Sequence, residues 1–169
     1  YNSLQAVIQK RFSHSYQFQV SYTLGKAMDN TQAQLAADAN NSSVYPQDPY
    51  DREGDWTRAD FDVRHRLVIN WLFEVPGFKG STGIKHALLA GWQVNGIASW
   101  LSGRPFSIGG TNGGLQQSGG LQTINVVGDA SIGYGNAGPD EQWINPAAFA
   151  QPVGATWGNS GRNAFRGPG

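Results

Sequence analysis

The residues most able to do chemistry are four carboxylates that lie close together in the first half of the chain. They are Asp48, Asp51, Glu53 and Asp55. Ca²⁺ prefers hard oxygen ligands such as carboxylates. A possible calcium site therefore consists of Asp51, Glu53 and Asp55. Their spacing differs from that of the helix-loop-helix calcium site, so we favour a solvated acidic loop and keep calcium as the alternative.

A run of alternating charges follows this acidic group. Its members are Arg58, Asp60, Asp62, Arg64 and Arg66. We favour a structural ladder of ion pairs at the mouth of the strands, and contact with a ligand is the alternative. Parity directs Arg64 and Arg66 to the polar side of the strand that they begin. Together with Trp56, these sets give the candidate ligand-facing residues: Asp48, Asp51, Glu53, Asp55, Trp56, Arg64 and Arg66.

Other kinds of reactive site have no support in the sequence. His14, His65 and His86 are isolated and lack metal-ligand spacing, so each is interpreted as a turn or interface residue. No G-x-S-x-G motif supports a nucleophilic serine, and no Gly-Lys-Ser/Thr follows the glycine runs. The chain has no cysteine. We therefore expect no enzyme, no catalytic residue, no bound metal beyond the calcium alternative and no cofactor.

The composition restricts the class of protein further. The 169 residues carry 12 Lys+Arg and 12 Asp+Glu, so the formal net charge is zero. This balance argues against a nucleic-acid partner, because binding to phosphates requires an excess of basic residues. Charged residues are 14% of the chain, against about 25% in ordinary soluble domains. Charged side chains therefore cover less of this protein's surface than they do in an ordinary soluble domain.

Strict alternation of apolar and polar residues predicts the strands that carry these groups. In Tyr16–Leu24 the apolar residues share one parity, and Gln, Ser and Thr share the other. A preceding alternation from Leu4 to Gln9 and the short connector Phe12–Ser15 predict a hairpin. Similar patterns predict strands at Arg64–Phe73 and Trp92–Leu101.

The remaining segments are loop-like. Residues 25–62 hold eight of the twelve acidic residues, and such a long connection suggests function. Beyond Gly103 the chain is loop-like and rich in glycine, and short strands are expected only at Pro105–Ile108 and Leu121–Val127. We therefore divide the chain into 1–108, barrel-wall strands with the acidic loop 25–62, and 109–169, a Gly-rich extracellular loop region.

The residues on the polar strand faces help to decide whether this sheet lies in a membrane or in water. They carry Gln, Ser, Asn and Thr in place of charge, as expected where one face meets lipid and the other a polar lumen. Aromatic residues expected at the membrane interfaces are Tyr16, Tyr22, Trp71, Phe73, Trp92 and Trp100. We favour a transmembrane barrel. A soluble or surface-fibre β-sandwich that binds glycans through exposed aromatics is the alternative.

Several blocks of the chain also resemble a known family. They include Phe18-Gln-Val-Ser-Tyr-Thr-Leu-Gly-Lys-Ala-Met-Asp29, Asp60-Phe-Asp-Val-Arg-His-Arg-Leu-Val68, Gly91-Trp-Gln-Val-Asn-Gly-Ile97 and Gly158-Asn-Ser-Gly-Arg-Asn-Ala-Phe-Arg-Gly-Pro-Gly169. In this order they resemble the C-terminal β-barrel portion of Oar-like TonB-dependent outer-membrane receptors. The resemblance implies a bacterial outer-membrane transporter of about 22 strands, embedded in lipid, that imports a ligand with energy from the TonB system.

The strand count limits what this chain can form by itself. Four to six strands cannot close a membrane barrel, for which about eight are needed. We therefore expect a fragment of a receptor, with TonB contacted by an N-terminal part that lies outside it. The expected fold is all-β: an antiparallel meander of long amphipathic strands, part of a transmembrane β-barrel, with long acidic and Gly-rich loops.

Overall fold

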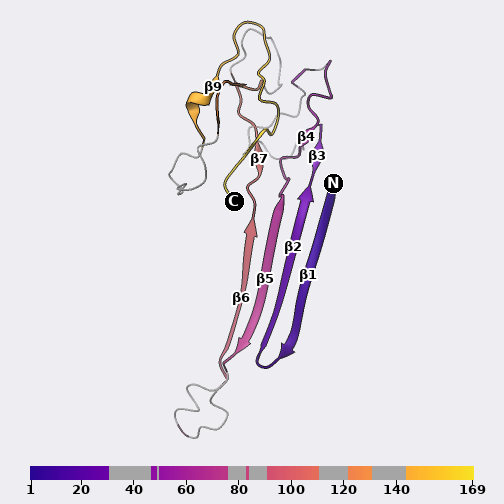
Figure 1. Ribbon diagram of the computed structural model, residues 1–169, viewed down its shortest axis with the longest axis vertical. Helices are drawn as coiled ribbons and strands as arrows, with labels where there is room; N and C mark the ends of the chain where they lie inside the picture. The colour runs from indigo at the N-terminus through magenta and orange to yellow at the C-terminus, as the bar shows by residue number, and fades with distance from the viewer. Residues whose placement is uncertain (31–46, 49, 76–82, 84–90, 111–121, 131–143) are drawn as a thin grey trace. The chain divides into compact units, whose positions relative to one another are not determined.

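The structure is a computed structural model that describes residues 1–30, 47–48, 50–75, 83, 91–110, 122–130 and 144–169. Four long strands form one sheet in the order β1-β2-β5-β6 (Figure 1). They are β1 (Asn2–Ser13), β2 (Tyr16–Lys26), β5 (His65–Glu74) and β6 (Gln93–Leu101). The pairings of β2 with β5 and of β5 with β6 are antiparallel, which confirms the predicted all-β meander.

The register of these strands separates two faces, because residues directly opposite one another point to the same side. Tyr16 lies opposite Phe73, and Phe73 lies opposite Val94. The apolar face therefore consists of Tyr16, Phe18, Val20, Tyr22, Leu24, Leu67, Ile69, Trp71, Phe73, Val94, Ala98 and Trp100. The polar face carries Gln17, Gln19, Ser21, Thr23, Arg66, Asn70, Gln93, Asn95 and Ser99.

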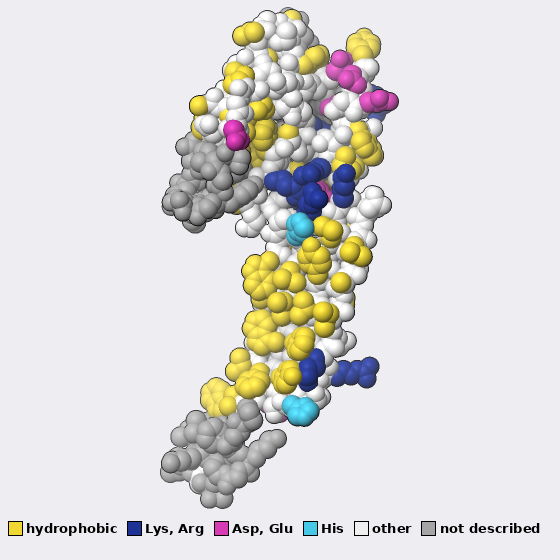
Figure 2. All heavy atoms as spheres, in the orientation of Figure 1, with side chains coloured by type: hydrophobic (Ala, Val, Ile, Leu, Met, Phe, Trp, Pro, Cys, Tyr) yellow, Lys and Arg dark blue, Asp and Glu magenta, His cyan; other side chains and the backbone are white. Residues whose placement is uncertain are grey.

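The apolar face is open to its surroundings. Trp100 is 56% exposed, and Trp71 and Phe73 are also exposed. In Figure 2 hydrophobic side chains form a continuous band along the strands. A face of this kind is not the surface of a protein in water, since large contiguous apolar patches mark contact with another apolar phase.

A tight turn joins the first two strands. His14 and Ser15 have φ angles of 54° and 68°. Positive φ at both central residues is the requirement of a type I′ turn, whose twist matches that of the flanking strands. The predicted hairpin is confirmed, and its loop is two residues shorter than the expected connector Phe12–Ser15.

The acidic loop and the C-terminal region leave the sheet at the same end of its strands. Leu24 pairs with His65 and Arg66 pairs with Leu101, so β2 ends, β5 begins and β6 ends there. The chain divides into a sheet unit, residues 3–25 and 64–102, and a loop unit, residues 1–2, 26–63 and 103–169. The acidic loop thus clusters with the C-terminal region, whereas the sequence grouped it with the strands.

The loop unit contains short strands paired across large sequence distances. They are β3 (Met28–Asp29) with β4 (Thr57–Arg58), β7 (Pro105–Phe106) with β10 (Phe165–Arg166), and β8 (Asn125–Val126) with β9 (Phe149–Ala150). A 3₁₀ turn, η1 (Pro146–Ala148), precedes β9. β7 and β8 fall within the predicted short strands but are only two residues long. In the described ranges no helix is long and apolar enough to span a membrane.

The interior of the loop unit is mainly polar. Among its described residues, the buried hydrophobic ones are Ala27, Ala59, Ile124 and Ala148, and Pro105 is also fully buried. Its buried polar and charged residues are Asp55, Asp62, Ser107, Gln122, Thr123, Arg162 and Asn163. Buried polar groups are stable where they find partners. In the described ranges, the buried side-chain atoms without a hydrogen bond include Arg162 Nε, Arg162 Nη1 and Arg166 Nε.

The close contact between Gly103 and the backbone of Gly167 can be tested by substitution. A Cβ at Gly103 would lie 1.7 Å from the carbonyl oxygen of Gly167, whereas a Cβ at Gly128 would meet its nearest atom at 3.6 Å. Gly103→Ala should destabilise the loop unit by about 1–3 kcal/mol because backbone must move, and Gly128→Ala should be nearly neutral. Hydrogen exchange of the full-length protein measures both, and equal protection in the two variants would contradict the packing.

Candidate functional site

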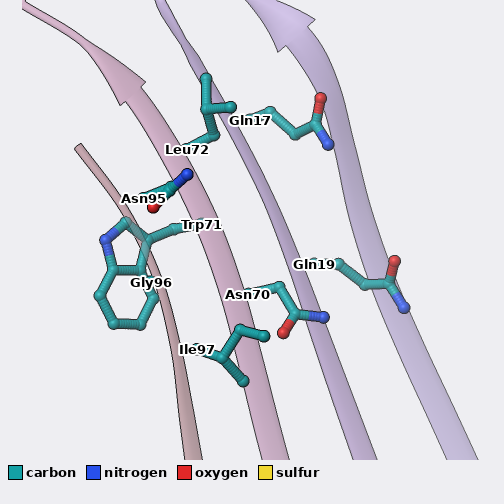
Figure 3. A pocket seen from close by; sticks show the side chains of 8 residues that line it. All are labelled: Gln17, Gln19, Asn70, Trp71, Leu72, Asn95, Gly96 and Ile97. Carbon is teal, nitrogen blue, oxygen red and sulfur yellow. The ribbon is translucent and has the colours of Figure 1, made fainter. Parts of the chain in front are cut away.

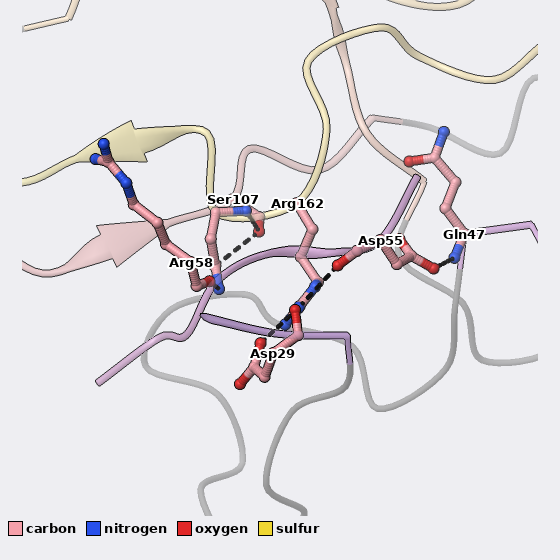
Figure 4. Close-up of polar contacts among 7 residues, drawn as sticks. Asp29, Gln47, Asp55, Arg58, Ser107 and Arg162 are labelled. Atoms are coloured by element: carbon pink, nitrogen blue, oxygen red, sulfur yellow. Dashed lines mark hydrogen bonds and ion pairs between the residues drawn. The ribbon is translucent and has the colours of Figure 1, made fainter. Parts of the chain in front are cut away.

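Arg162 holds the centre of the loop unit together. Its side chain reaches two segments that lie more than a hundred positions earlier (Figure 4). Nη2 donates to the Asp29 carbonyl oxygen at 2.7 Å, to Asp29 Oδ1 at 2.6 Å and to the Asp55 carbonyl oxygen at 3.0 Å. Arg162 is only 6% exposed. The contact is thus a buried, charge-assisted clamp on the two ends of the acidic loop.

The residues on either side of Arg162 have a left-handed backbone conformation. Gly161 and Asn163 both have positive φ, 73° and 52°, which glycine and asparagine tolerate best. Asn163 then bonds in two directions. Its N–H donates to Ser107 Oγ at 2.9 Å, and its Nδ2 donates to the Arg58 carbonyl oxygen at 2.7 Å. Asn163, the neighbour of Arg162, therefore joins β4 and the segment after β7 to the clamp (Figure 4).

A second clamp forms around Asp62. Arg166 Nη2 pairs with Asp62 Oδ2, while Arg166 Nη1 donates to the Gly103 carbonyl oxygen at 3.0 Å. The other carboxylate oxygen, Asp62 Oδ1, accepts from the N–H of Ala27 at 2.8 Å. Both oxygens of this buried carboxylate are satisfied, so its charge is retained without an unpaired acceptor.

These clamps correct the predicted ladder. In the part of the chain that the structure describes, the ion pairs are Arg162–Asp29 and Arg166–Asp62, and neither joins two members of the run from Arg58 to Arg66. Asp62 instead takes its partner, Arg166, from 104 positions further along the chain. Arg66 lies opposite Thr23 on the polar face, as its parity predicts.

A pocket of about 220 Å³ opens beside the first clamp. One wall comes from the acidic loop and the other from the segment before Arg162. The lining residues are Gln47, Asp48, Asp51, Gly54, Asp55, Trp157, Gly158, Asn159 and Gly161. The pocket therefore includes three of the predicted ligand-facing carboxylates and adds Trp157, which sequence reasoning did not single out.

The carboxylates of this pocket bond to the backbone. Asp48 Oδ1 accepts from the N–H of Tyr50 at 2.8 Å, and Asp51 Oδ1 accepts from the N–H of Gly54 at 3.1 Å. Among the described residues no group of three or more His, Asp or Glu side chains is placed to hold a metal ion. The calcium alternative at Asp51, Glu53 and Asp55 is therefore not supported, because the carboxylates act as turn-forming acceptors instead.

The other predicted site residues lie apart from this pocket. Glu53 and Trp56 are exposed, and neither lines the pocket; Arg64 and Arg66 belong to the sheet unit. His14 occupies the hairpin turn, as predicted, and His65 lies at the start of β5 with its Nδ1 2.8 Å from Tyr22 Oη. His86 lies outside the described residues.

Burial shifts the acidity of one pocket residue. The pKa of Asp55 is raised from its ordinary value, first because burial penalises the charged carboxylate and then because Asp51 and Asp48 lie nearby. The N–H of Gln47, which donates to Asp55 Oδ2 at 3.1 Å, and the charge of Arg162 oppose this rise. The net direction shows that these partners do not fully compensate the buried charge.

A hollow of about 430 Å³ lies on the sheet unit (Figure 3). Its lining includes the amides of Gln17, Gln19, Asn70 and Asn95, with Leu72 and Ile97 among them. These residues share the polar face. Trp71 and Gly96, which face one another across β5 and β6, complete the lining. The polar face is thus uncharged over the middle of the sheet and interrupted by apolar side chains.

Comparison with known proteins identifies the kind of sheet to which these strands belong. The profile of the outer membrane beta barrel domain matches residues 1–169. The chain belongs to this family. No curated protein and no solved structure gives a significant match. The outer-membrane barrel is therefore confirmed, and membership places the chain in the bacterial outer membrane, which removes the soluble sandwich from consideration.

The strand dimensions of this outer membrane beta barrel domain fit the membrane. β2 has 11 residues. At about 3.3 Å per residue its length is about 36 Å, and a tilt of about 40° leaves about 28 Å along the membrane normal. The apolar band of such barrels is about 25 Å tall. The exposed apolar face is therefore the lipid face, and the polar face is directed to the lumen.

The register also orders the interface aromatics. Tyr16 and Phe73 form one terminal row, and Tyr22 and Trp100 lie with Leu67 in a row near the opposite end. Trp92 precedes β6, and its carbonyl oxygen accepts from the N–H of Val75 at 3.0 Å. Trp71 was predicted at an end but lies one row further in, opposite Phe18 and Gly96, so its indole covers a glycine.

The two faces should respond oppositely to an added charge. Ile69 is central on the lipid face, in the row with Val20 and Ala98, and the next residue, Asn70, faces the lumen. Ile69→Lys should destabilise the full barrel by about 2–4 kcal/mol, because the ammonium group enters the hydrocarbon. Asn70→Lys is the matched control and should cost far less. Urea titration of the barrel in lipid vesicles measures both; equal losses would contradict the assignment of the faces.

The raised pKa of Asp55 predicts a pH-dependent effect on the loop unit. Since the folded-state pKa exceeds the unfolded value of about 3.9, the group disfavours folding increasingly as pH rises through that interval. Asp55→Asn should therefore raise the stability of the loop unit at pH 7, with a smaller gain at pH 4. Hydrogen-exchange protection factors of residues 50–62 report this. Lower protection at pH 7 would mean that attraction to Arg162 outweighs burial.

Proposed function

We propose that this outer membrane beta barrel domain is a non-enzymatic segment of a TonB-dependent outer-membrane receptor. In this role the sheet unit forms part of the barrel wall, and the loop unit is the extracellular surface that faces the ligand. The partners are outer-membrane lipid, an imported ligand and the TonB system, which is contacted through an N-terminal part of the receptor. The resemblance of the sequence blocks to Oar-like receptors supports this role.

The observation that carries the proposal is the organisation of the loop unit. A wall alone needs only short turns between strands, such as the one at His14 and Ser15. Here two buried arginines, Arg162 and Arg166, fix long connections into one body that includes a pocket. Loops held in place by a rigid scaffold are where binding residues concentrate, and preorganisation lowers the entropy cost of binding.

The composition of the lumen face agrees with a gated transporter. A water-filled pore is lined by polar and charged side chains. In this sheet Val68, Leu72, Ile97 and Leu101 lie among the amides of the lumen face, and Ile97 is 76% exposed. Apolar side chains at these positions are better suited to contact with a protein plug than with bulk water. Such a plug is implied by the resemblance.

Labelling of single cysteines tests the topology, because the chain has no cysteine of its own. In the full receptor on intact cells, Glu53→Cys should react with a maleimide too large for porins. Ser13→Cys, next to the hairpin turn, should react only after the outer membrane is permeabilised. The purified receptor should also bind the periplasmic domain of TonB. Protection of Glu53→Cys would contradict the extracellular assignment, and absence of TonB binding would contradict the transport mechanism.

A further inference from the structure

The β1–β2 hairpin carries positive charge without a matching negative charge. Residues 1–28 include Lys10, Arg11 and Lys26 but neither Asp nor Glu. Lys10 and Arg11 are close to the turn that begins at His14, whereas Lys26 is the last residue of β2 at the other end. In Figure 2 basic side chains lie beside the hydrophobic band at its hairpin end. Positive charge is therefore collected at this end of the membrane-spanning strands.

The ammonium group of Lys10 lies against the lipid face. Its Nζ is 3.8 Å from the centroid of the Tyr16 ring, and Tyr16 belongs to the terminal row of that face. Nζ also donates to the carbonyl oxygen and to the hydroxyl of Ser13. The aromatic ring and the two oxygens hold the ammonium in place. All three partners are neutral, so they leave the positive charge uncompensated.

The acid at this end of the sheet is engaged on the other face. Glu74 is the one Asp or Glu in residues 63–128, and its N–H donates to the carbonyl oxygen of Ser15, in the turn, at 2.7 Å. Its Oε1 accepts from Nε2 of Gln93 at 2.9 Å, and Gln93 lies opposite it on the polar face. In the described part of the chain the ion pairs involve neither Lys10 nor Glu74. The lipid face therefore ends in a cation without a counter-ion.

This arrangement suits a phospholipid with a negatively charged headgroup. Tyr16 and Phe73 form the last row of the apolar face and are 39% and 40% exposed, so acyl chains can lie against them. A lysine stem follows apolar surface while its ammonium reaches the headgroup level. Phosphate oxygens form strong, charge-assisted hydrogen bonds with an ammonium group. Only a lipid uses both the apolar row and the cation, whereas a soluble phosphate would use the cation alone.

We propose that Lys10 binds the phosphate of an anionic phospholipid whose acyl chains lie along Tyr16 and Phe73. The Tyr16 ring positions the ammonium group, and the exposed guanidinium of Arg11 adds to the positive potential at this end. The site requires only a barrel in lipid. It therefore goes beyond the proposed function and does not depend on transport or on TonB.

The test compares two lipids with identical acyl chains, dioleoyl phosphatidylglycerol and dioleoyl phosphatidylcholine. Native mass spectrometry of the purified full receptor in detergent measures both affinities. Phosphatidylglycerol should bind about fivefold more tightly or better, and this ratio should fall as ammonium acetate is raised. Excess glycerol 3-phosphate should not displace the lipid, because it lacks acyl chains. Equal binding of the two lipids, or displacement by glycerol 3-phosphate, would overturn the proposal.

Charge variants separate Lys10 from general electrostatics. Lys10→Gln should lower the phosphatidylglycerol-to-phosphatidylcholine ratio about fivefold and leave the binding of phosphatidylcholine unchanged. Lys10→Arg retains the charge and should retain the ratio. Lys26→Gln is the matched control, because it removes an equal charge from the other end of β2 and should have no effect. An equal loss in Lys26→Gln would contradict the site, as would the loss of both lipids in Lys10→Gln.

The aromatic ring provides an independent measurement. Tyr16→Phe should keep the ratio, because phenylalanine preserves the face under the ammonium group, while Tyr16→Leu should lower it about twofold or more. Equal ratios in these two variants would contradict the positioning role of the ring. A receptor that prefers phosphatidylglycerol but fails to bind TonB would refute only the transport mechanism. The reverse result would refute only the lipid site.

Discussion

The absence of water from the bilayer core is the constraint on which this structure depends. A backbone N–H or C=O group without a partner there costs several kcal/mol, so strands must bond to strands throughout the membrane. β5 satisfies this demand by pairing with β2 on one side and β6 on the other. The pairing fixes the register, and the register in turn assigns alternate residues to lipid and lumen. One requirement thus determines both the strands and the period-two pattern of their side chains.

The same constraint explains why the loop unit has a polar interior. Large apolar side chains such as Trp71, Ile69 and Phe18 are placed outward on the lipid face, so they cannot form a core. The loop unit instead buries small alanines and arginine clamps. Removing one partner from a buried pair leaves an uncompensated charge at a cost of about 3–5 kcal/mol. Arg162 and Arg166 therefore fix which loop segments lie together, because each links residues more than a hundred positions apart.

This division also explains what the sequence could predict. Alternation is a local signal, so the long strands were located to within a few residues and the faces of β2 and β5 were assigned correctly. The clamps depend on contacts that sequence spacing does not reveal, since Arg162 and Asp29 are 133 positions apart. Asp62 was assigned to a ladder of its neighbours because nothing local points to Arg166. The available signal was compositional: two arginines in a glycine-flanked block could balance the surplus of acid in residues 25–62.

Two buried aspartates in the loop unit differ in how their carboxylates are bonded. Asp62 is 3% exposed and has both oxygens bonded, by Ala27 and Arg166. Asp55 is buried to a similar degree, yet its carboxylate has one backbone partner and a raised pKa. The contrast therefore follows from the partners: Asp62 is ion-paired with Arg166, whereas the Asp55 carboxylate accepts from a backbone N–H.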